Sequence, residues 1–293
     1  MQNNMLVTIL TPTYNRAGML PILYESIKKQ LCLDFEWIIV DDGSIDNTSD
    51  IVKPWLDETL FSIRYIKQNN GGKHRAVNRG VKEAKGDLLF IVDSDDVLPI
   101  DSIAIIKTEY NKIKGNINYC GICGLKAYFT GGKVGGENNY SELECNSLDF
   151  RYKYHIKGDV AEVFITDVIK QYPFPEISGE NFCPEDVVWQ RIAKKYIFHN
   201  FYKKIYLCDY FPDGLTKKIT KIRMQSPVAS TICYKELTES VVPLIIKVRA
   251  SINYWRFWFC PSKERKKCIK PCWIWTLPFG LLMHLNDKIH NNY

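Results

Sequence analysis

The chain of 293 residues is long enough for one large domain or for one domain with an extension. Apolar residues make up 46% and charged residues 25% of it, which excludes wholesale disorder and collagen-like or low-complexity architectures. Of the net charge of +6, residues 1–215 carry 25 Lys and Arg against 29 Asp and Glu, and residues 216–293 carry 14 against 4. The basic second part favours an anionic partner.

The N-terminal sequence and the cysteines indicate in which cellular compartment the chain is expected. The first apolar run, Met5–Leu10, is too short for a secretory signal and predicts a strand. The chain is therefore expected in the cytoplasm, where its ten cysteines would remain free thiols. Cys120-x-x-Cys123 and Cys268-x-x-x-Cys272 have metal-like spacing, but neither has a second cysteine or histidine pair nearby. Buried or inert thiols are the favoured interpretation, and structural zinc is the alternative.

Strand and helix periods alternate through the first hundred residues. Short apolar runs with β-branched or aromatic members predict strands at Leu6–Leu10, Trp37–Val40, Ile63–Ile66 and Leu88–Val92. Apolar residues at helical spacing predict helices over 20–31, 51–60 and 76–84, the second of them distorted by Pro54. The alternation predicts an α/β fold of Rossmann-like type, with a mostly parallel sheet covered by helices on both faces.

The pattern is less regular after Pro99. It predicts helices over 103–113 and 184–195, strands over 118–129 and 160–166, and a strand pair or helix end over 197–210. The polar, Gly-rich stretch 130–158 predicts a long loop on the active-site or acceptor side. A composition change near Thr216 separates a domain over 1–215 from a basic, aromatic-rich helical extension over 216–293.

Polar motifs follow three of the predicted strands at their carboxyl ends, where open α/β sheets bind ligands. They are Thr11-Pro12-Thr13-Tyr14-Asn15-Arg16, Asp41-Asp42-Gly43-Ser44 and Asp93-Ser94-Asp95-Asp96. Each alone is compatible with ordinary turn or helix-cap chemistry. Their joint placement at one edge of the sheet indicates a binding site.

The acidic motif after the fourth predicted strand suits a metal ion. Asp93 and Asp95 alternate just beyond a buried-looking strand and can direct two carboxylates at one point. Mg²⁺ and Mn²⁺ prefer such oxygen ligands, shared with substrate phosphates, whereas the alternative is a solvated acidic loop. Neither G-x-G-x-x-G nor G-x-x-x-x-G-K-[ST] occurs, which disfavours a dinucleotide fold and a P-loop.

Taken in order, four motifs resemble an inverting family 2 glycosyltransferase of the GT-A fold. They are Thr11–Arg16, Asp41–Ser44, Asn70-Gly71-Gly72-Lys73-His74 leading to Asn78, and Asp93–Asp96. The resemblance covers about residues 5–115 and continues more loosely to Thr216. It implies a nucleotide-diphosphate sugar as donor, with a UDP-sugar expected, and a Mn²⁺ or Mg²⁺ ion. The acceptor would be a hydroxyl of a glycan or lipid-linked glycan in surface polysaccharide synthesis.

The resemblance also implies roles for individual residues. The nucleotide-sugar site would comprise Thr11, Pro12, Tyr14, Arg16, Asp42, Lys73, His74, Asn78, Asp93 and Ser94. Within this site, Asp42 would contact the base of the nucleotide. Asp93 and Asp95 would form the DxD element, with Asp95 and Asp96 nearest the metal ion.

An acidic pair in the second half matches the place where the family has its general base. Glu185-Asp186 follows Pro184, and Ser178-Gly179-Glu180 lies just upstream. The resemblance implies that Asp186 takes the acceptor's proton, with Glu185 beside it. The alternative is that both carboxylates only complement the dipole at a helix N-terminus.

The basic second part carries two further predictions. Residues 216–226 resemble a loop that closes over the donor, although a solvated basic loop is the alternative. Residues 244–283 combine an apolar helical stripe, a Lys/Arg cluster and a Trp-rich run too short to span a bilayer. They predict an interfacial segment on an anionic, cytoplasmic membrane surface, or a helical extension packed on the catalytic body. Nucleic acid is not expected as a partner.

Two other functions stay open. One is a non-catalytic member of the same fold that binds a nucleotide sugar or a glycan, against which the acidic motif and Glu185-Asp186 argue. The other is a sugar-nucleotide pyrophosphorylase, which would require a Gly-rich loop after the first strand, where Thr11–Arg16 has no glycine. Fold alone does not decide among them.

Overall fold

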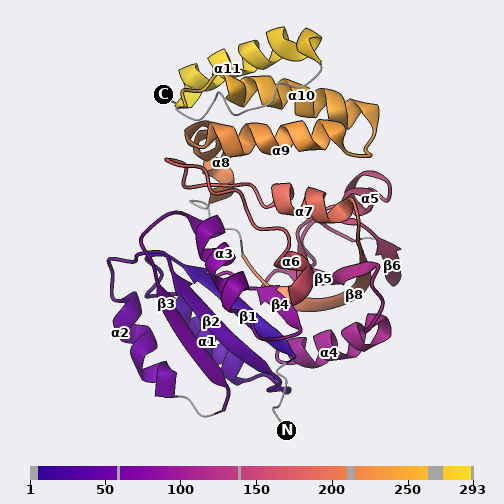
Figure 1. Ribbon diagram of the computed structural model, residues 1–293. Helices are drawn as coiled ribbons and strands as arrows, with labels where there is room; N and C mark the ends of the chain where they lie inside the picture. The colour runs from indigo at the N-terminus through magenta and orange to yellow at the C-terminus, as the bar shows by residue number, and fades with distance from the viewer. Residues whose placement is uncertain (1–5, 58–59, 138–139, 210–214, 263–272, 292–293) are drawn as a thin grey trace. The chain divides into compact units, whose positions relative to one another are not determined.

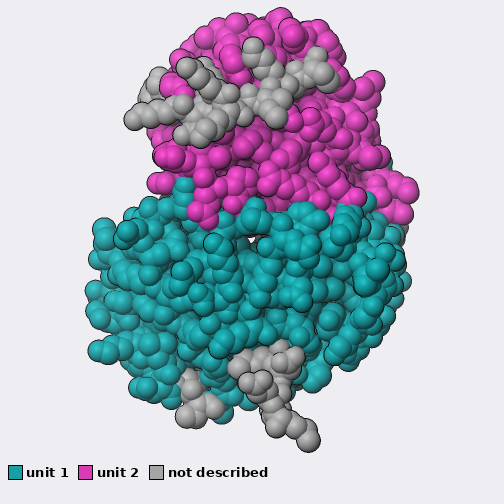
Figure 2. Space-filling model, in the orientation of Figure 1, with its two compact units in different colours: residues 1–146, 155–173, 195–209 teal, residues 147–154, 174–194, 210–293 magenta. Residues whose placement is uncertain are grey.

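The computed structural model describes residues 6–57, 60–137, 140–209, 215–262 and 273–291. The chain divides into two compact units (Figure 2). Unit 1 consists of residues 1–146, 155–173 and 195–209, and unit 2 of residues 147–154, 174–194 and 210–293. The boundary predicted near residue 216 stays a prediction.

Unit 1 is built on one eight-stranded sheet with the order β3-β2-β1-β4-β7-β5-β8-β6 (Figure 1). Its strands are β1 (Val7–Thr13), β2 (Phe35–Asp41), β3 (Ser62–Lys67), β4 (Leu88–Ile91), β5 (Tyr119–Ala127), β6 (Glu142–Cys145), β7 (Val160–Ile165) and β8 (Ile197–Leu207). Strands β3, β2, β1 and β4 pair in parallel, as do β5 and β8, while β7 and β6 pair antiparallel with their neighbours. The predicted α/β fold with a mostly parallel sheet is confirmed.

Helices cover both faces of this sheet. They are α1 (Leu20–Lys28), α2 (Thr48–Val52), the 3-10 helix η1 (Lys53–Asp57), α3 (Lys73–Glu83), α4 (Ser102–Ile113) and α6 (Thr166–Ile169). Residues of α1, α2 and α4 share a core with Ile9, Trp37 and Phe90 of the sheet. Helix α3 packs on the opposite face, because Gly80 lies against Leu10, whose side chain points away from that of Ile9.

The four strands predicted in the first hundred residues are confirmed, with small shifts at their ends. Strand β1 continues to Thr13 and β2 to Asp41, so the polar motifs begin within the strands. Helix α1 ends at Lys28, and Leu31, which the helical spacing placed on the buried face, is exposed. Pro54 falls in η1, where the α2 helix has already ended.

Two predictions in the second half were wrong. The stretch 130–158, predicted as one loop, contains strand β6 and helix α5 (Ser147–Tyr152). Residues 197–207 form the single long strand β8 rather than a strand pair or helix end. Strand β6 escaped prediction because it is short and polar and forms by pairing with β8, a partner more than fifty residues away.

Unit 2 is helical. It contains α5, α7 (Asp186–Ala193), α8 (Leu215–Gln225), α9 (Pro227–Glu239), α10 (Leu244–Trp258), the 3-10 helix η3 (Ile274–Thr276) and α11 (Leu277–Asn291). Helices α9, α10 and α11 lie side by side (Figure 1). The predicted helix over 184–195 and the helical extension are confirmed. The segment 216–226, predicted as a loop, is mostly helix α8.

The described cysteines are free thiols, as predicted. Among the described residues eight cysteines are present, seven of them buried and none bonded to another. Cys120 and Cys123 both lie on β5, whereas Cys268 and Cys272 lie outside the described residues. Across the described part of the chain, no helix is long and apolar enough to cross a membrane.

A close backbone contact at the start of β4 generates a stability prediction. A Cβ added to Gly86 would lie 2.6 Å from the backbone nitrogen of Thr8, and backbone cannot withdraw as a side chain can. Gly86→Ala is expected to lower the free energy of unfolding by about 1–3 kcal/mol, measured by denaturant titration. Gly18→Ala, where a Cβ would meet nothing within 4 Å, is the matched control. Equal stability of the two variants would contradict the expectation.

Candidate active site

The loops that follow β1 and β2 are bonded to each other. Asn15, with φ of 52°, accepts a hydrogen bond from the backbone N–H of Ile45 at 2.9 Å. Its own N–H donates to Ser44 Oγ, also at 2.9 Å. The N–H of Ser44 in turn donates to Asp41 Oδ1 at 2.7 Å. These reciprocal bonds hold the first two sequence motifs side by side at the carboxyl ends of adjacent strands.

The carboxylate of Asp42 organises a third loop. It is buried and accepts hydrogen bonds from the side chain of Gln68 at 2.7 Å and from the backbone N–H of Gly72 at 2.7 Å. The N–H of Gly71 and the Asn70 amide add further bonds at 3.1 Å. Asp42 thereby fixes the Asn70-Gly71-Gly72 turn that leads into α3, and the structure brings two motifs together that lie 28 residues apart.

A hollow of about 690 Å³ opens between the loops after β2 and β3. It is lined by Gly43, Ser44, Ile45, Lys67, Gln68, Asn69 and Asn70. Gly43 has φ of +82°, and a Cβ there would lie 2.7 Å from the backbone nitrogen of Asn70. Glycine is therefore required both for the turn and for the close approach of the two loops.

The acidic loop after β4 is compensated by two cationic side chains. Lys73 Nζ lies 2.7 Å from Asp93 Oδ1, and Arg16 Nη2 lies 3.7 Å from Asp95 Oδ2. Burial acts to raise the pKa of Asp93, but Lys73, Lys126 and Arg16 outweigh it and lower that pKa below its usual value. Arg16 from the loop after β1 and Lys73 from the start of α3 thus both lie beside the acidic loop after β4.

Tyr206 of β8 forms hydrogen bonds with this loop, and the sequence did not predict this role. Its buried hydroxyl accepts the backbone N–H of Asp93 at 2.9 Å and donates to Asp96 Oδ2 at 2.6 Å. Lys126 Nζ lies 4.1 Å above its ring. No local signal marks Tyr206, because its role depends on the pairing of β5 with β8.

Asp96 differs from its neighbours in this loop. Its carboxylate is buried on Tyr206, whereas those of Asp93 and Asp95 are 32% and 28% exposed. Burial, reinforced by the charges of Asp93 and Asp95, raises the pKa of Asp96 to about 7, against the opposing effects of Tyr206 and Lys126. The predicted metal role of Asp96 stays a prediction. Asp93 and Asp95 are the more accessible pair.

The other predicted donor-site residues lie around the same loops. Thr11 is fully buried, and its hydroxyl accepts a hydrogen bond from Trp37 Nε1 at 2.9 Å. Tyr14 is exposed. The remaining predicted residues that are buried are Pro12 at the end of β1, His74 and Asn78 on α3, and Ser94 in the acidic loop. Their contacts with a donor stay predictions.

The predicted base belongs to unit 2. Asp186 is the first residue of α7, Glu185 precedes it, and both are exposed. The charge of Asp186 adds to the effect of burial in raising the pKa of Tyr152 on α5. Upstream, Glu180 is buried and its two carboxylate oxygens accept the N–H groups of Val228 and Ala229 at 2.8 and 2.9 Å. Glu180 therefore caps α9, which is a structural role.

The acidic loop after β4 has the donor set for a divalent cation. Asp93 and Asp95 offer accessible carboxylate oxygens, which Mg²⁺ and Mn²⁺ prefer. Their partners Lys73 and Arg16 are long side chains, each about 40% exposed, that can withdraw when another cation takes their place. The exposure of Asp93 and Asp95 and of their cationic partners is therefore compatible with the predicted role of these two aspartates as metal ligands.

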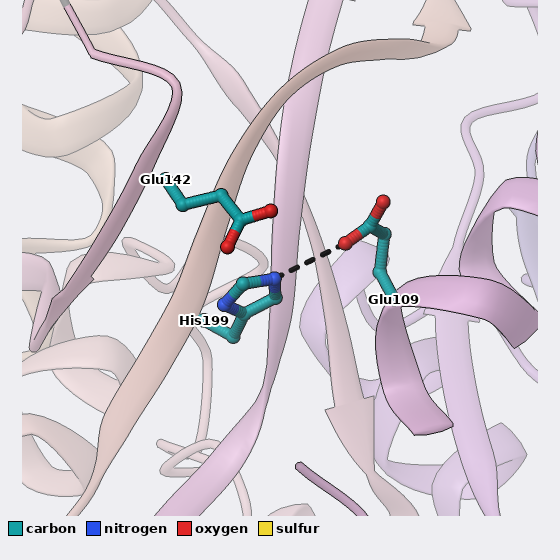
Figure 3. Close-up of side chains that lie close together, drawn as sticks. All are labelled: Glu109, Glu142 and His199. Carbon is teal, nitrogen blue, oxygen red and sulfur yellow. Dashed lines mark hydrogen bonds and ion pairs between the residues drawn. The ribbon is translucent and has the colours of Figure 1, made fainter. Parts of the chain in front are cut away.

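A second group of carboxylates and a histidine lies elsewhere in unit 1. Glu109 of α4, Glu142 of β6 and His199 of β8 have ligand atoms within 4.8 Å of one another (Figure 3). Lys112 Nζ already lies 2.6 Å from Glu109 and 2.5 Å from Glu142, and Lys203 Nζ lies 2.7 Å from Glu109. Burial acts to raise the pKa of Glu109, but these lysines and His199 lower it to about 2. The group is an ion-pair network that could take a metal only if Lys112 withdrew.

Residues 8–124 match the protein family described as Glycosyl transferase family 2. Among curated proteins, the chain is 36% identical over 190 residues to glycosyltransferase GlyG of Streptococcus pneumoniae, covering 65% of this chain and 50% of GlyG. It is 37% identical over 119 residues to abequosyltransferase RfbV of Salmonella typhimurium, covering 40% and 35% of the two chains. The matched part of the chain thus spans 50% of the length of GlyG and 35% of the length of RfbV.

Solved structures share the fold at low sequence identity. Staphylococcus aureus TarS 1–349 in complex with UDP-GlcNAc aligns with a TM-score of 0.61 and 16% identity, covering 98% of this chain and 92% of TarS. Mannosyltransferase PcManGT from Pyrobaculum calidifontis, in complex with GDP-Man and Mn²⁺, aligns with a TM-score of 0.55 and 15% identity, covering 97% and 75% of the two chains. At this identity the likeness concerns the fold alone.

The bonds of Asp42 generate a prediction for the site. Asp42→Asn places an amide NH₂ among backbone N–H donors that require an acceptor, so the variant is expected to lose about 1–3 kcal/mol of stability. Amide hydrogen exchange at residues 70–72 should quicken more than at the core strands. Asp57→Asn, an exposed carboxylate at the end of η1, is the matched control. Unchanged exchange at Gly71 and Gly72 would count against the role given to Asp42.

Proposed function

This chain belongs to glycosyl transferase family 2, and from that premise we propose that it transfers a sugar from a nucleoside-diphosphate sugar to a hydroxyl of an acceptor glycan. UDP is the nucleotide proposed, in keeping with the UDP-GlcNAc complex of the similarly folded TarS. The acceptor proposed is a glycan or lipid-linked glycan of a surface polysaccharide, as the resemblance to the family implies. Residues 1–215 are proposed as the catalytic domain.

The observation that carries the proposal is the charge arrangement at the sheet edge. Asp93 and Asp95 are accessible, each lies beside a cationic side chain, and the turn held by Asp42 leads directly into the helix that carries Lys73. A diphosphate needs positive charge on more than one side. Arg16 and Lys73 supply such charge from β1 and α3, and they would exchange their carboxylate partners for phosphate oxygens.

A divalent cation would be held by Asp93 and Asp95. When bound, it would offset the negative charge that develops on the leaving diphosphate. The hollow lined by Gly43 and Gln68 offers space for part of the nucleotide. Asp42 would then act chiefly by keeping the Gly71-Gly72 turn in place, since its oxygens already accept several hydrogen bonds.

Asp186 is proposed as the general base. Its carboxylate is exposed at the first turn of α7, where an acceptor hydroxyl can reach it. Arg191 of the same helix forms a two-pronged ion pair with Glu236 of α9, at 2.9 and 2.7 Å, and so orients α7. Asp186 would take the hydroxyl proton as the oxygen attacks the anomeric carbon, and a single displacement inverts that centre.

A donor screen tests this proposal. Purified full chain is incubated with UDP-, GDP- and dTDP-sugars and Mn²⁺, and release of nucleoside diphosphate is measured with and without an acceptor mixture. Asp95→Ala and Asp186→Asn are each expected to lower turnover by about 10²-fold or more, and only Asp95→Ala should also weaken Mn²⁺-dependent donor binding. Asp57→Ala is the matched control.

Two outcomes would contradict the proposal. Donor binding without turnover in any combination would indicate the non-catalytic binding function. Full activity of Asp186→Asn would exclude Asp186 as the base while leaving the transferase assignment intact.

The support that Tyr206 gives to the acidic loop generates a kinetic prediction. Tyr206→Phe removes the hydroxyl that joins the Asp93 N–H to Asp96, so the metal half-saturation constant is expected to rise about 3–10-fold while kcat changes less. Tyr110→Phe, which alters a buried tyrosine elsewhere in unit 1, on α4, is the control for general destabilisation. A loss confined to kcat would argue against a positioning role.

A further inference from the structure

The C-terminal helix α11 packs on its neighbours through small and polar side chains. Thr276 just before the helix, and Gly280, His284 and Asp287 within it, recur every three or four residues and are all buried. Residues at this spacing lie on one face of a helix. The fully buried positions of α11 are therefore small or polar, with Leu277 and Leu281 half-buried beside them.

Specific contacts fix this orientation. Asp287 forms a two-pronged ion pair with Arg256 of α10, and the Thr276 hydroxyl lies 2.7 Å from that of Ser251. A Cβ on Gly280 would lie 2.4 Å from Cβ of Trp255, so the two helices approach as closely as glycine permits. Rotation of α11 would break the ion pair and force this close contact apart.

The opposite face of α11 is apolar and exposed. Leu282 is 65% and Ile289 75% accessible to solvent. The exposed apolar side chains on and next to this helix are Ile274, Trp275, Phe279, Leu282, Met283, Leu285 and Ile289, here called the α11 face. An amphipathic helix normally turns such residues toward the core. In α11 these residues face solvent instead. Soluble monomers rarely expose so many large apolar side chains on one helix.

The charged residues of α10, of α11 and of the sequence segment between them are mostly basic. Asp287 is the only acidic residue of α10 and α11, and it is neutralised by Arg256. Lys247, Arg249 and Lys288 are the other charged residues of these helices, and the segment 263–270 that precedes α11 in the sequence has five Lys or Arg and one Glu. An apolar face with tryptophan, on a segment whose net charge is positive, is complementary to anionic lipid.

We propose that α11 lies flat on an anionic membrane surface, with the α11 face inserted among the acyl chains. Spanning is excluded for this helix, because its 15 residues are fewer than the ~20 that a bilayer requires. A second copy of the chain is a poorer occupant, since it would bring the same basic residues together. The sequence predicted a membrane contact over 244–283; within that range Trp255 of the α10 stripe is buried, and the contact proposed here is the α11 face over 274–289.

Vesicle flotation of the full chain, without any nucleotide sugar, tests the proposal independently of catalysis. Wild-type protein is expected to float with vesicles of 70% phosphatidylcholine and 30% phosphatidylglycerol, and far less with pure phosphatidylcholine. Leu282→Ser/Ile289→Ser is expected to lower the partition coefficient by about tenfold or more. Leu31→Ser/Ile117→Ser removes two equally exposed apolar side chains from unit 1 and should float like wild type.

Three results would overturn the proposal. The first is wild-type protein that stays unbound with anionic vesicles. The second is equal loss of flotation in both double variants, which would show that general surface hydrophobicity is responsible. The third is a concentration-dependent dimer, seen by light scattering, that Leu282→Ser/Ile289→Ser abolishes while vesicle binding persists. A circular dichroism spectrum of each variant verifies that the helices are intact.

Discussion

Compensation of negative charge at the edge of the sheet is the constraint on which the rest of unit 1 depends. Five aspartates, at positions 41, 42, 93, 95 and 96, follow β2 and β4, and a carboxylate removed from water is costly unless donors or cations surround it. The compensating groups differ: the backbone N–H of Ser44 for Asp41, backbone amides for Asp42, Lys73 and Arg16 for Asp93 and Asp95, and the Tyr206 hydroxyl for Asp96. These bonds hold the loops after β1, β2 and β3 and the start of α3 in one arrangement.

Backbone groups and side chains compensate these carboxylates in different ways, and the two kinds of partner have different roles. The amides that hold Asp42 belong to the backbone and cannot leave without unfolding the turn at Gly71 and Gly72. Lys73 and Arg16 are long, half-exposed side chains that can change partners at little cost. Under the proposed function, the first kind keeps the site preorganised, and the second kind exchanges carboxylate for phosphate when the donor binds.

Unit 2 shows the same dependence on a few polar contacts. Glu180 caps α9, Arg191 ties α7 to Glu236, and Asp287 ties α11 to Arg256. The last of these contacts decides which side of α11 meets solvent, and it overrides the ordinary preference of leucine and isoleucine for the interior. Hydrophobic patterning alone would orient that helix wrongly, because it would turn Leu282 and Ile289 toward the interior.

The local sequence determined the first four strands, their helices and the polar motifs at the strand ends, because period-2 and period-3.6 patterns and short-range turn chemistry are local properties. The resemblance to family 2 glycosyltransferases implied that Arg16 and Lys73 share a site with Asp93 and Asp95. Only the tertiary structure decided that β6 pairs with β8, that Tyr206 lies beneath the acidic loop, and that α11 exposes its apolar side. Each of these depends on contacts between residues far apart in the chain, whose energies no local pattern contains.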